Sequence, residues 1–234
     1  MLRLKDFDSI FIFQYGRVGS HTLVGALEPH HDNVIHTHIS NYNEPRFKSD
    51  KKLIITVSRN FYDRQISAFF LKFCEPDEDF GYCSKEDLAK TEVDLKMMKF
   101  FRKGNINFLK NRLGKGVFFT NFYHSMGTNL LSEPFDHIKK YKIVNVPERN
   151  LDILSLRFED LHLWGYILSN IFNEDIGIPE KNLTSRKHKI PELMEKFKRY
   201  YKYSQEEIDL IEESDTMTYF YTDQENEYFK NKYL

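Results

Sequence analysis

The sequence contains no long apolar run and few cysteines, and its charges almost cancel. No run approaches the about 18 apolar residues of a membrane-spanning helix, and the first residues, MLRLKDFDS, lack the apolar core of a signal peptide. We therefore expect no membrane span and a cytoplasmic location, where Cys74 and Cys83 stay as thiols. With 34 Lys and Arg against 35 Asp and Glu, no excess of positive charge favours nucleic acid as a partner.

The chain also lacks the Walker A pattern of ordinary ATP- and GTP-binding loops. That pattern separates two glycines by four residues and continues with Lys and then Ser or Thr. Here Gly16 and Gly19 are only three positions apart, and Ser20 and His21 follow them. A P-loop-like kinase would also need an acidic residue that holds Mg²⁺ at a strand end, and none stands out. A kinase is therefore disfavoured, while another phosphate-bearing ligand is not.

What the sequence does contain is an apolar strand followed by a glycine-containing loop and a helix. The run Ile10–Phe13 predicts a buried strand, and residues 15–20, Tyr-Gly-Arg-Val-Gly-Ser, cannot extend it. From Ser20, which we expect to be the helix N-cap, apolar residues recur at helical spacing up to Leu27. Backbone N–H groups and the helix dipole favour an anion at such a loop. A plain turn from strand to helix is the alternative.

The rest of the chain alternates strands with helices, which predicts an α/β fold with a central, mostly parallel sheet flanked by helices. We expect one domain over residues 1–234, with a helical C-terminal part. A Ser-x-x-Glu pattern at Ser204 and a Thr-x-x-Glu pattern at Thr222 are capping boxes, which predict two closing helices. The other expected strands are 33–39, 52–58, 141–146 and 153–158, and the other expected helices are 61–73, 88–113 (weakest at Gly104), 161–172 and one opened by Pro191.

Three polar features follow strands that are expected to be parallel neighbours. They are the loop at residues 15–20, His38 after a short strand, and Arg59 directly after the apolar strand 52–58. In open parallel sheets, ligands bind beyond the carboxyl ends of the strands. Strand alternation puts His36 on the same face as His38, so either imidazole is a candidate general base. If neither histidine serves, the base is a carboxylate, and Glu44 and Asp63 are the nearest candidates in the sequence. A zinc site built on these histidines is an alternative, although no cysteine or carboxylate completes a recognised pattern.

Three segments resemble the sulfotransferases that use 3′-phosphoadenosine-5′-phosphosulfate (PAPS). Residues 15–23 are similar to the family's 5′-phosphosulfate loop, usually Tyr-Pro-Lys-Ser-Gly-Thr-Thr. Arg59 and Ser67, eight positions apart, are similar to its 3′-phosphate motif, and Thr37-His38 to its catalytic Thr-His. The sequence most resembles a bacterial branch described as acting in capsular polysaccharide synthesis. The strong motifs cover the first third of the chain, and Leu156–Leu161 extends the resemblance weakly.

The resemblance implies a P-loop-like sulfotransferase fold that transfers a sulfuryl group from PAPS to a hydroxyl, with a carbohydrate as acceptor and 3′,5′-ADP as product. It implies His38 as general base and Arg17 as the cation at the leaving phosphate. The chain departs from the family at Arg17, usually Lys, and at His36, where cytosolic members carry Lys. It also departs at Arg186-Lys187-His188, where the family has an Arg-Lys-Gly loop that clamps the nucleotide. The implied nucleotide-binding residues are Gly16, Arg17, Val18, Gly19, Ser20, His21, Thr22, Arg59, Ser67, Arg186 and Lys187.

The acceptor is not readable from any motif. Segments 41–50, 75–90 and 119–130 carry no recognisable pattern and are the candidates for acceptor binding. No metal is required for this chemistry, since positioning and charge neutralisation are the main tasks of the protein. A nucleotide- or glycan-binding module of the same fold without turnover is the alternative to an enzyme.

Overall fold

A computed structural model describes residues 2–14, 19–38, 51–74, 93–113, 133–179 and 190–234. The chain divides into two compact units, and each is built from two separate segments. The first unit comprises Met1–Arg59 and Phe118–Lys181, and the second comprises Asn60–Val117 and Asn182–Leu234. The expectation of one domain over residues 1–234 stays a prediction.

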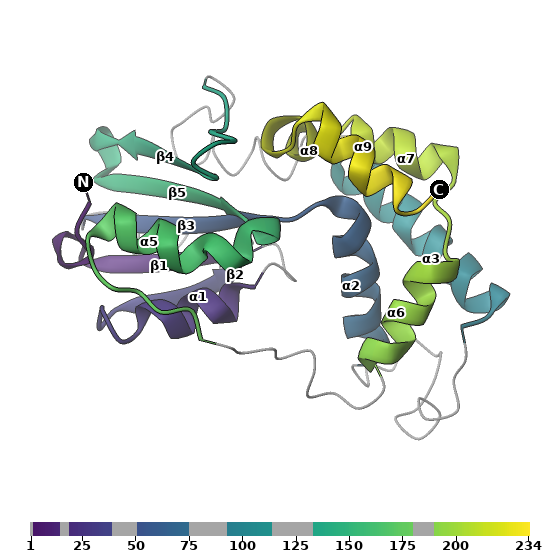
Figure 1. Cartoon of the computed structure of the whole chain (residues 1–234), viewed down its shortest axis with the longest axis horizontal. Coiled ribbons are helices and arrows are strands. Elements are labelled where there is room, and N and C mark those ends of the chain that lie inside the picture. The colour runs from purple at the N-terminus through teal and green to yellow at the C-terminus, as the bar shows by residue number, and fades with distance from the viewer. Residues whose placement is uncertain (1, 15–18, 39–50, 75–92, 114–132, 180–189) are drawn as a thin grey trace. The chain divides into compact units, whose positions relative to one another are not determined.

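The first unit contains a five-stranded sheet in its described part, with strand order β2-β1-β3-β5-β4 (Figure 1). Four neighbouring strands are parallel, and β4 runs antiparallel to β5 at one edge. The prediction of an α/β fold with a mostly parallel sheet flanked by helices is therefore confirmed. The strands are β1 (Ser9–Gln14), β2 (Val34–His38), β3 (Lys52–Ser58), β4 (Tyr141–Val146) and β5 (Leu151–Arg157).

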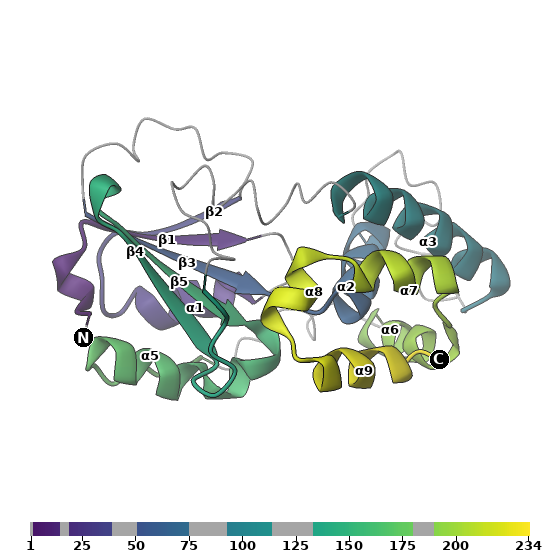
Figure 2. The same ribbon diagram turned by 90° about the horizontal axis from the view of Figure 1, so that it is seen from above.

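The inner strands read as nearly continuous apolar runs because both of their faces are covered. All residues of β3 and of β5 are buried. Helices α1 (Ser20–Leu27) and α5 (Trp164–Phe172) share a hydrophobic core with alternate residues of β1, β3 and β5 (Figure 2). The strand residues of that core are Ile10, Ile12, Leu53, Ile55, Val57, Leu154 and Leu156. This face of the sheet is therefore the one beneath α1 and α5.

Three short helices lie between or before the strands and longer helices in the described part of this unit. They are the 3₁₀-helices Leu4–Asp6, Pro147–Arg149 and Phe158–Leu163. The last of them precedes α5, so the predicted helix 161–172 begins as a 3₁₀-helix. An acidic residue before a helix commonly caps it, but Asp160 pairs with Arg157 instead of capping α5. The guanidinium Nε lies 2.6 Å from Asp160 Oδ2, and the pair is buried.

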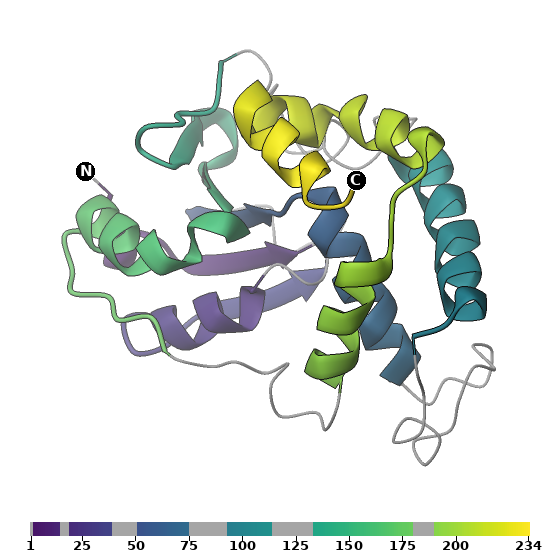
Figure 3. The same cartoon turned by 45° about the vertical axis from the view of Figure 1, so that its right-hand side comes forward.

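The second unit is helical throughout its described part (Figure 3). An aromatic cluster forms its core. In this cluster the rings of Phe101 and Phe197 pack edge to face against each other, with their centroids 5.2 Å apart. The helices are α2 (Phe61–Cys74), α3 (Leu95–Phe108), α6 (Ile190–Tyr200), α7 (Gln205–Glu212), α8 (Asp215–Phe220) and α9 (Asp223–Asn231).

The capping predictions for this unit are confirmed, and two other predictions are wrong. Ser204 and Thr222 form complete capping boxes at the starts of α7 and α9. A third helix, α8, lies between them and was not expected. The weak point at Gly104 is absent, because α3 continues through it and is followed by a π-helix, Leu109–Leu113.

No helix in the described part of the chain is long and apolar enough to cross a lipid bilayer.

Candidate functional site

The strand order creates a switch in connection direction between β1 and β3. From β1 the chain continues through α1 to β2, on one side of β1 in the sheet. After β3 it returns to the sheet at β4 and β5, on the opposite side. In open α/β sheets, ligands bind beyond the carboxyl ends of two such strands. The predicted phosphate loop follows β1 and Arg59 follows β3, so both belong to this position.

The start of α1 differs from the sequence prediction by one residue. Gly19, not Ser20, is the N-cap, and its φ of 76° lies in the left-handed region that favours glycine. Ser20 is the first helical residue of α1, directly after this N-cap. The prediction of Ser20 as N-cap is therefore wrong, because the chain turns at Gly19 and Ser20 already lies inside the helix. Thr22 is buried, and its backbone N–H donates to the Gly19 carbonyl at 3.0 Å.

The hydroxyl of Ser20 is hydrogen-bonded to His36 on β2. Ser20 Oγ lies 2.9 Å from His36 Nε2, and Ser20 is 3% exposed. His36 pairs in register with Ile12, so it faces α1. The ring of His21, which is exposed, lies 4.5 Å from that of His36 between centroids. Two imidazoles and one hydroxyl thus meet at the N-terminus of α1, where the helix dipole favours an anion.

His38 is the last residue of β2 and pairs in register with Gln14 at the end of β1. Its backbone therefore lies at the carboxyl edge of the sheet, as predicted. The side chain of His38 lies outside the described part of the structure. The choice of His38 over His36 as general base stays a prediction.

Arg59 lies at the carboxyl end of β3, where its guanidinium stacks on an aromatic ring. Its Cζ atom is 4.3 Å from the ring centroid of Phe158, the residue that follows β5. Because Ser58 and Arg157 are paired across the parallel strands, the next residue of each strand is adjacent at the edge. Such a stack is a cation–π contact that restricts the long Arg side chain.

Ser67, the second residue of the predicted 3′-phosphate motif, lies on α2 and is 5% exposed. It belongs to the second unit, whereas Arg59 belongs to the first. Its joint role with Arg59 stays a prediction. The remaining predicted site residues lie outside the described residues, as do the three expected acceptor segments. These site residues are Gly16, Arg17, Val18, Arg186 and Lys187.

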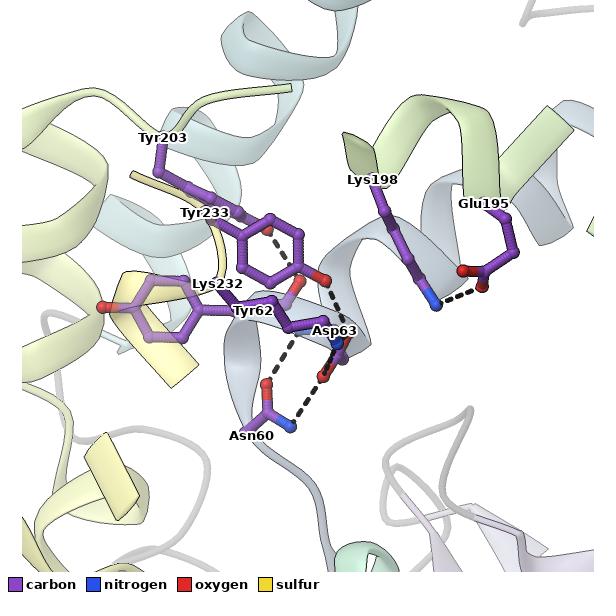
Figure 4. Close-up of polar contacts among 8 residues, drawn as sticks. All are labelled: Asn60, Tyr62, Asp63, Glu195, Lys198, Tyr203, Lys232 and Tyr233. Atoms are coloured by element: carbon purple, nitrogen blue, oxygen red, sulfur yellow. Dashed lines mark hydrogen bonds and ion pairs between the residues drawn. The ribbon is translucent and has the colours of Figure 1, made fainter. Parts of the chain in front are cut away.

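Asp63 is an alternative base candidate near the start of α2, and its carboxylate is already engaged (Figure 4). It accepts hydrogen bonds from Lys232 Nζ at 2.9 Å and from Tyr233 Oη at 2.5 Å. Asn60 Nδ2 donates to it at 3.2 Å, and the Asn60 amide oxygen in turn caps α2 by accepting from the Asp63 N–H. The carboxylate oxygens of Asp63 are therefore already occupied by hydrogen-bond donors of the second unit. Glu44, the other acidic candidate, lies outside the described residues.

Tyrosine hydroxyls of the second unit are poor bases as well. Burial raises the pKa of Tyr62, and the carboxylates of Glu212 and Glu227 add to the effect. Burial also raises the pKa of Tyr203, whose hydroxyl donates to the Tyr62 carbonyl at 2.7 Å. Both phenols are therefore protonated at neutral pH. Among the described residues, no group of three His, Cys, Asp or Glu side chains is arranged to hold a metal ion.

The sequence analysis missed two contacts of this site, those of Ser20 with His36 and of Arg59 with Phe158. Both join residues that are far apart in the sequence. The signal that could have revealed the second is positional, since Arg59 comes directly after the expected strand 52–58 and Phe158 ends the expected strand 153–158.

Comparison with protein-family models gives no match to this chain, and comparison with curated proteins gives none either. Its function is therefore inferred from its own residues and their geometry.

Proposed function

We propose that this chain is a PAPS-dependent sulfotransferase of P-loop-like fold that acts in the cytoplasm on a hydroxyl, with a carbohydrate as the acceptor. The observation that carries the proposal is the strand order, which brings the segment after β1 and Arg59 after β3 to the ligand-binding position of an open α/β sheet. Both segments are ones that resemble the phosphate-binding motifs of that family. The hydrogen-bonded pair of Ser20 and His36 at the N-terminus of α1 adds polar groups suited to an anion.

In this proposal two groups of residues bind the two phosphate-bearing ends of the nucleotide. The N-terminus of α1, with Ser20 and Thr22, binds the 5′-phosphosulfate end, where Arg17 adds a cation. Arg59 binds the 3′-phosphate through the N–H donors at the edge of its guanidinium, which match phosphate oxygens. PAPS supplies an activated sulfuryl group whose bond to the 5′-phosphate oxygen breaks during transfer.

The transfer needs one protein group that accepts the proton of the acceptor hydroxyl and another that stabilises the negative charge on the leaving phosphate. His38 takes the proton from the acceptor hydroxyl as its oxygen bonds to sulfur, since an imidazole titrates near neutral pH. The electron pair of the broken bond goes to the 5′-phosphate, where Arg17 and the helix N-terminus stabilise the growing negative charge. General base catalysis of this kind contributes about 10²–10⁴ in rate.

His36 is one position at which this chain departs from the cytosolic members of the family it resembles. A histidine replaces their Lys, and it bonds to Ser20 at the start of α1. We infer that His36 serves the donor end of the site and that His38 serves the acceptor end. His36→Asn should then weaken nucleotide binding, and His38→Asn should leave binding intact while turnover falls about 10²-fold or more.

The first experiment compares thermal stabilisation of the chain by 3′,5′-ADP and by ATP with Mg²⁺. Selective stabilisation by 3′,5′-ADP is expected. Stabilisation only by ATP with Mg²⁺ would favour the P-loop-like kinase. Binding of 3′,5′-ADP without transfer from labelled PAPS to any glycan or other hydroxyl acceptor would favour the non-catalytic module.

Calorimetry with variants then tests the phosphate contact. Arg59→Ala should weaken 3′,5′-ADP binding by about 1.5–3 kcal/mol, the range for a lost charge-assisted hydrogen bond. The matched control is Arg149→Ala, because Arg149 lies at the amino end of β5, on the opposite edge of the sheet, and should not alter affinity. Equal affinity of the wild-type protein and a folded Arg59→Ala variant would remove Arg59 from the site.

A further inference from the structure

The ring of Phe158 contacts both predicted phosphate-binding elements of the first unit. Phe158 follows β5 as Arg59 follows β3, and these strands are parallel neighbours. Side chains alternate along a strand, so Arg59 shares a face with Val57, and Phe158 shares that face with Leu156. Val57 and Leu156 belong to the core beneath α1 and α5. The stack of Arg59 on Phe158 therefore lies on the face from which α1 begins.

The same ring packs against the backbone at the end of the predicted phosphate loop. A Cβ atom placed on Gly19 would lie 3.2 Å from Cδ2 and from Cε2 of Phe158, and 3.2 Å from Cη2 of Trp164. Gly19 thus has close aromatic neighbours at the point where its φ of 76° turns the chain into α1. Trp164 is fully buried, and its Nε1 donates to the Arg157 carbonyl at 3.0 Å, so the tryptophan forms a fixed backing.

Arg59 can contact the ring of Phe158 and bind a phosphate at the same time. The Cζ atom of Arg59 lies over the ring of Phe158, 4.3 Å from its centroid. Phosphate is bound by N–H donors in the guanidinium plane, so stacking and phosphate binding are compatible. An Arg side chain loses rotamer freedom when it binds a ligand, and prior stacking removes part of that cost.

We propose that Phe158 is a positioning residue for the nucleotide phosphates, which sets Arg59 and the loop end at Gly19 in fixed relation before the nucleotide binds. The proposal rests on the function proposed above. Phe158 itself need not touch the nucleotide, because it acts through Arg59 and through Gly19. Its contribution should therefore disappear when Arg59 is removed.

A double-mutant cycle in 3′,5′-ADP affinity, measured by calorimetry, tests this dependence. Phe158→Leu keeps an apolar side chain and removes the ring, and it should weaken binding roughly 2- to 30-fold, the range that corresponds to a cation–π contact. In the Arg59→Ala background the same change should alter affinity less than about twofold, since no guanidinium remains to be positioned. Phe158→Tyr retains the ring and should bind nearly as the wild-type protein does.

Phe135→Leu is the matched control. Phe135 lies under a different guanidinium of the same unit, with Arg157 Cζ 5.6 Å from its ring centroid, so its loss should leave affinity unchanged. Fluorescence of Trp164 reports whether each variant is folded, because the chain has only 1 Trp. If Phe158→Leu does not fold, Phe158→Met takes its place in the cycle.

The possible results separate this proposal from the proposed function. If Arg59→Ala weakens binding and the Phe158 variants do not, Phe158 has no positioning role, and the proposed function stands. An equal loss from Phe158→Leu with and without Arg59 would also overturn the proposal, because the ring would then support the fold alone. If the wild-type protein does not bind 3′,5′-ADP, the proposed function fails and this proposal fails with it.

Discussion

Gly19→Ala is the substitution whose cost follows most directly from the structure. An alanine at the φ of 76° found there costs about 1–2 kcal/mol. The added methyl group would lie 3.2 Å from the rings of Phe158 and Trp164, and such overpacking costs about 1–3 kcal/mol. Alanine also reduces the backbone freedom of the unfolded chain, which stabilises the folded state by about 0.4–1 kcal/mol and offsets part of these costs. We therefore expect the free energy of unfolding of the first unit to fall by about 1–4.5 kcal/mol.

Urea unfolding followed by Trp164 fluorescence measures this change. The tryptophan is the only one in the chain and is 0% exposed, so its emission reports the unit that contains Gly19. The midpoint should shift to lower urea without a change of slope. The same variant should bind 3′,5′-ADP more weakly than the wild-type protein under conditions where it is folded, because the methyl group displaces the ring that holds Arg59.

Gly104→Ala is the matched control for the chemistry of the substitution. Gly104 lies inside α3, and nothing lies within 4 Å of a Cβ placed there. Alanine should stabilise this helix by about 1 kcal/mol. Urea unfolding of the helical unit, followed by circular dichroism, should therefore show a higher midpoint than that of the wild-type protein. A midpoint for Gly19→Ala equal to that of the wild-type protein would refute both the left-handed turn and the close ring contacts.

Three further predictions concern stability. Asp63→Asn should lower the free energy of helical unfolding by about 1–3 kcal/mol, since charge-assisted bonds to the C-terminal residues are lost; an unchanged urea midpoint by circular dichroism would contradict this. The raised pKa values of Tyr62 and Tyr203 mean that the folded state holds these protons more tightly, so stability is complete below about pH 10, the unfolded value, and falls as pH rises above it. Tyr62→Phe should make that alkaline decline shallower in urea titrations at successive pH values, and an unaltered pH dependence would count against burial as the cause. Asp160→Asn removes the carboxylate from the buried pair with Arg157 and should cost about 3–5 kcal/mol in unfolding followed by tryptophan fluorescence; a loss below 1 kcal/mol would argue that the pair is hydrated.

The site was only partly predictable from the sequence. Arg59 and the residues around Gly19 were predicted as site residues because each comes directly after an apolar strand, which is a local pattern. The partner of Ser20 was not identified, since a serine before a helix is normally read as its cap. His36 competes with that local role, and it becomes a neighbour of Ser20 only when β2 pairs with β1.

The fold shows the same division between local and distant information. Hydrophobic periodicity and capping chemistry are local, and they determined the strand 52–58, the helix from Ser20 to Leu27 and the capping boxes at Ser204 and Thr222. The periodicity of a strand does not specify its neighbours. The strand order, and the antiparallel direction of β4, were therefore decided by tertiary pairing.

The sequence by itself thus determined most of the strands and helices, although not α8, and it indicated the candidate segments after β1 and β3. Only the tertiary structure decided that Gly19 adopts a left-handed conformation against Phe158 and Trp164, and that Arg59 stacks on the same ring. These contacts join residues more than ninety positions apart, and they depend on strands β3 and β5 lying side by side in register. Local sequence cannot encode such a contact alone, because it arises from the packing of the whole sheet edge.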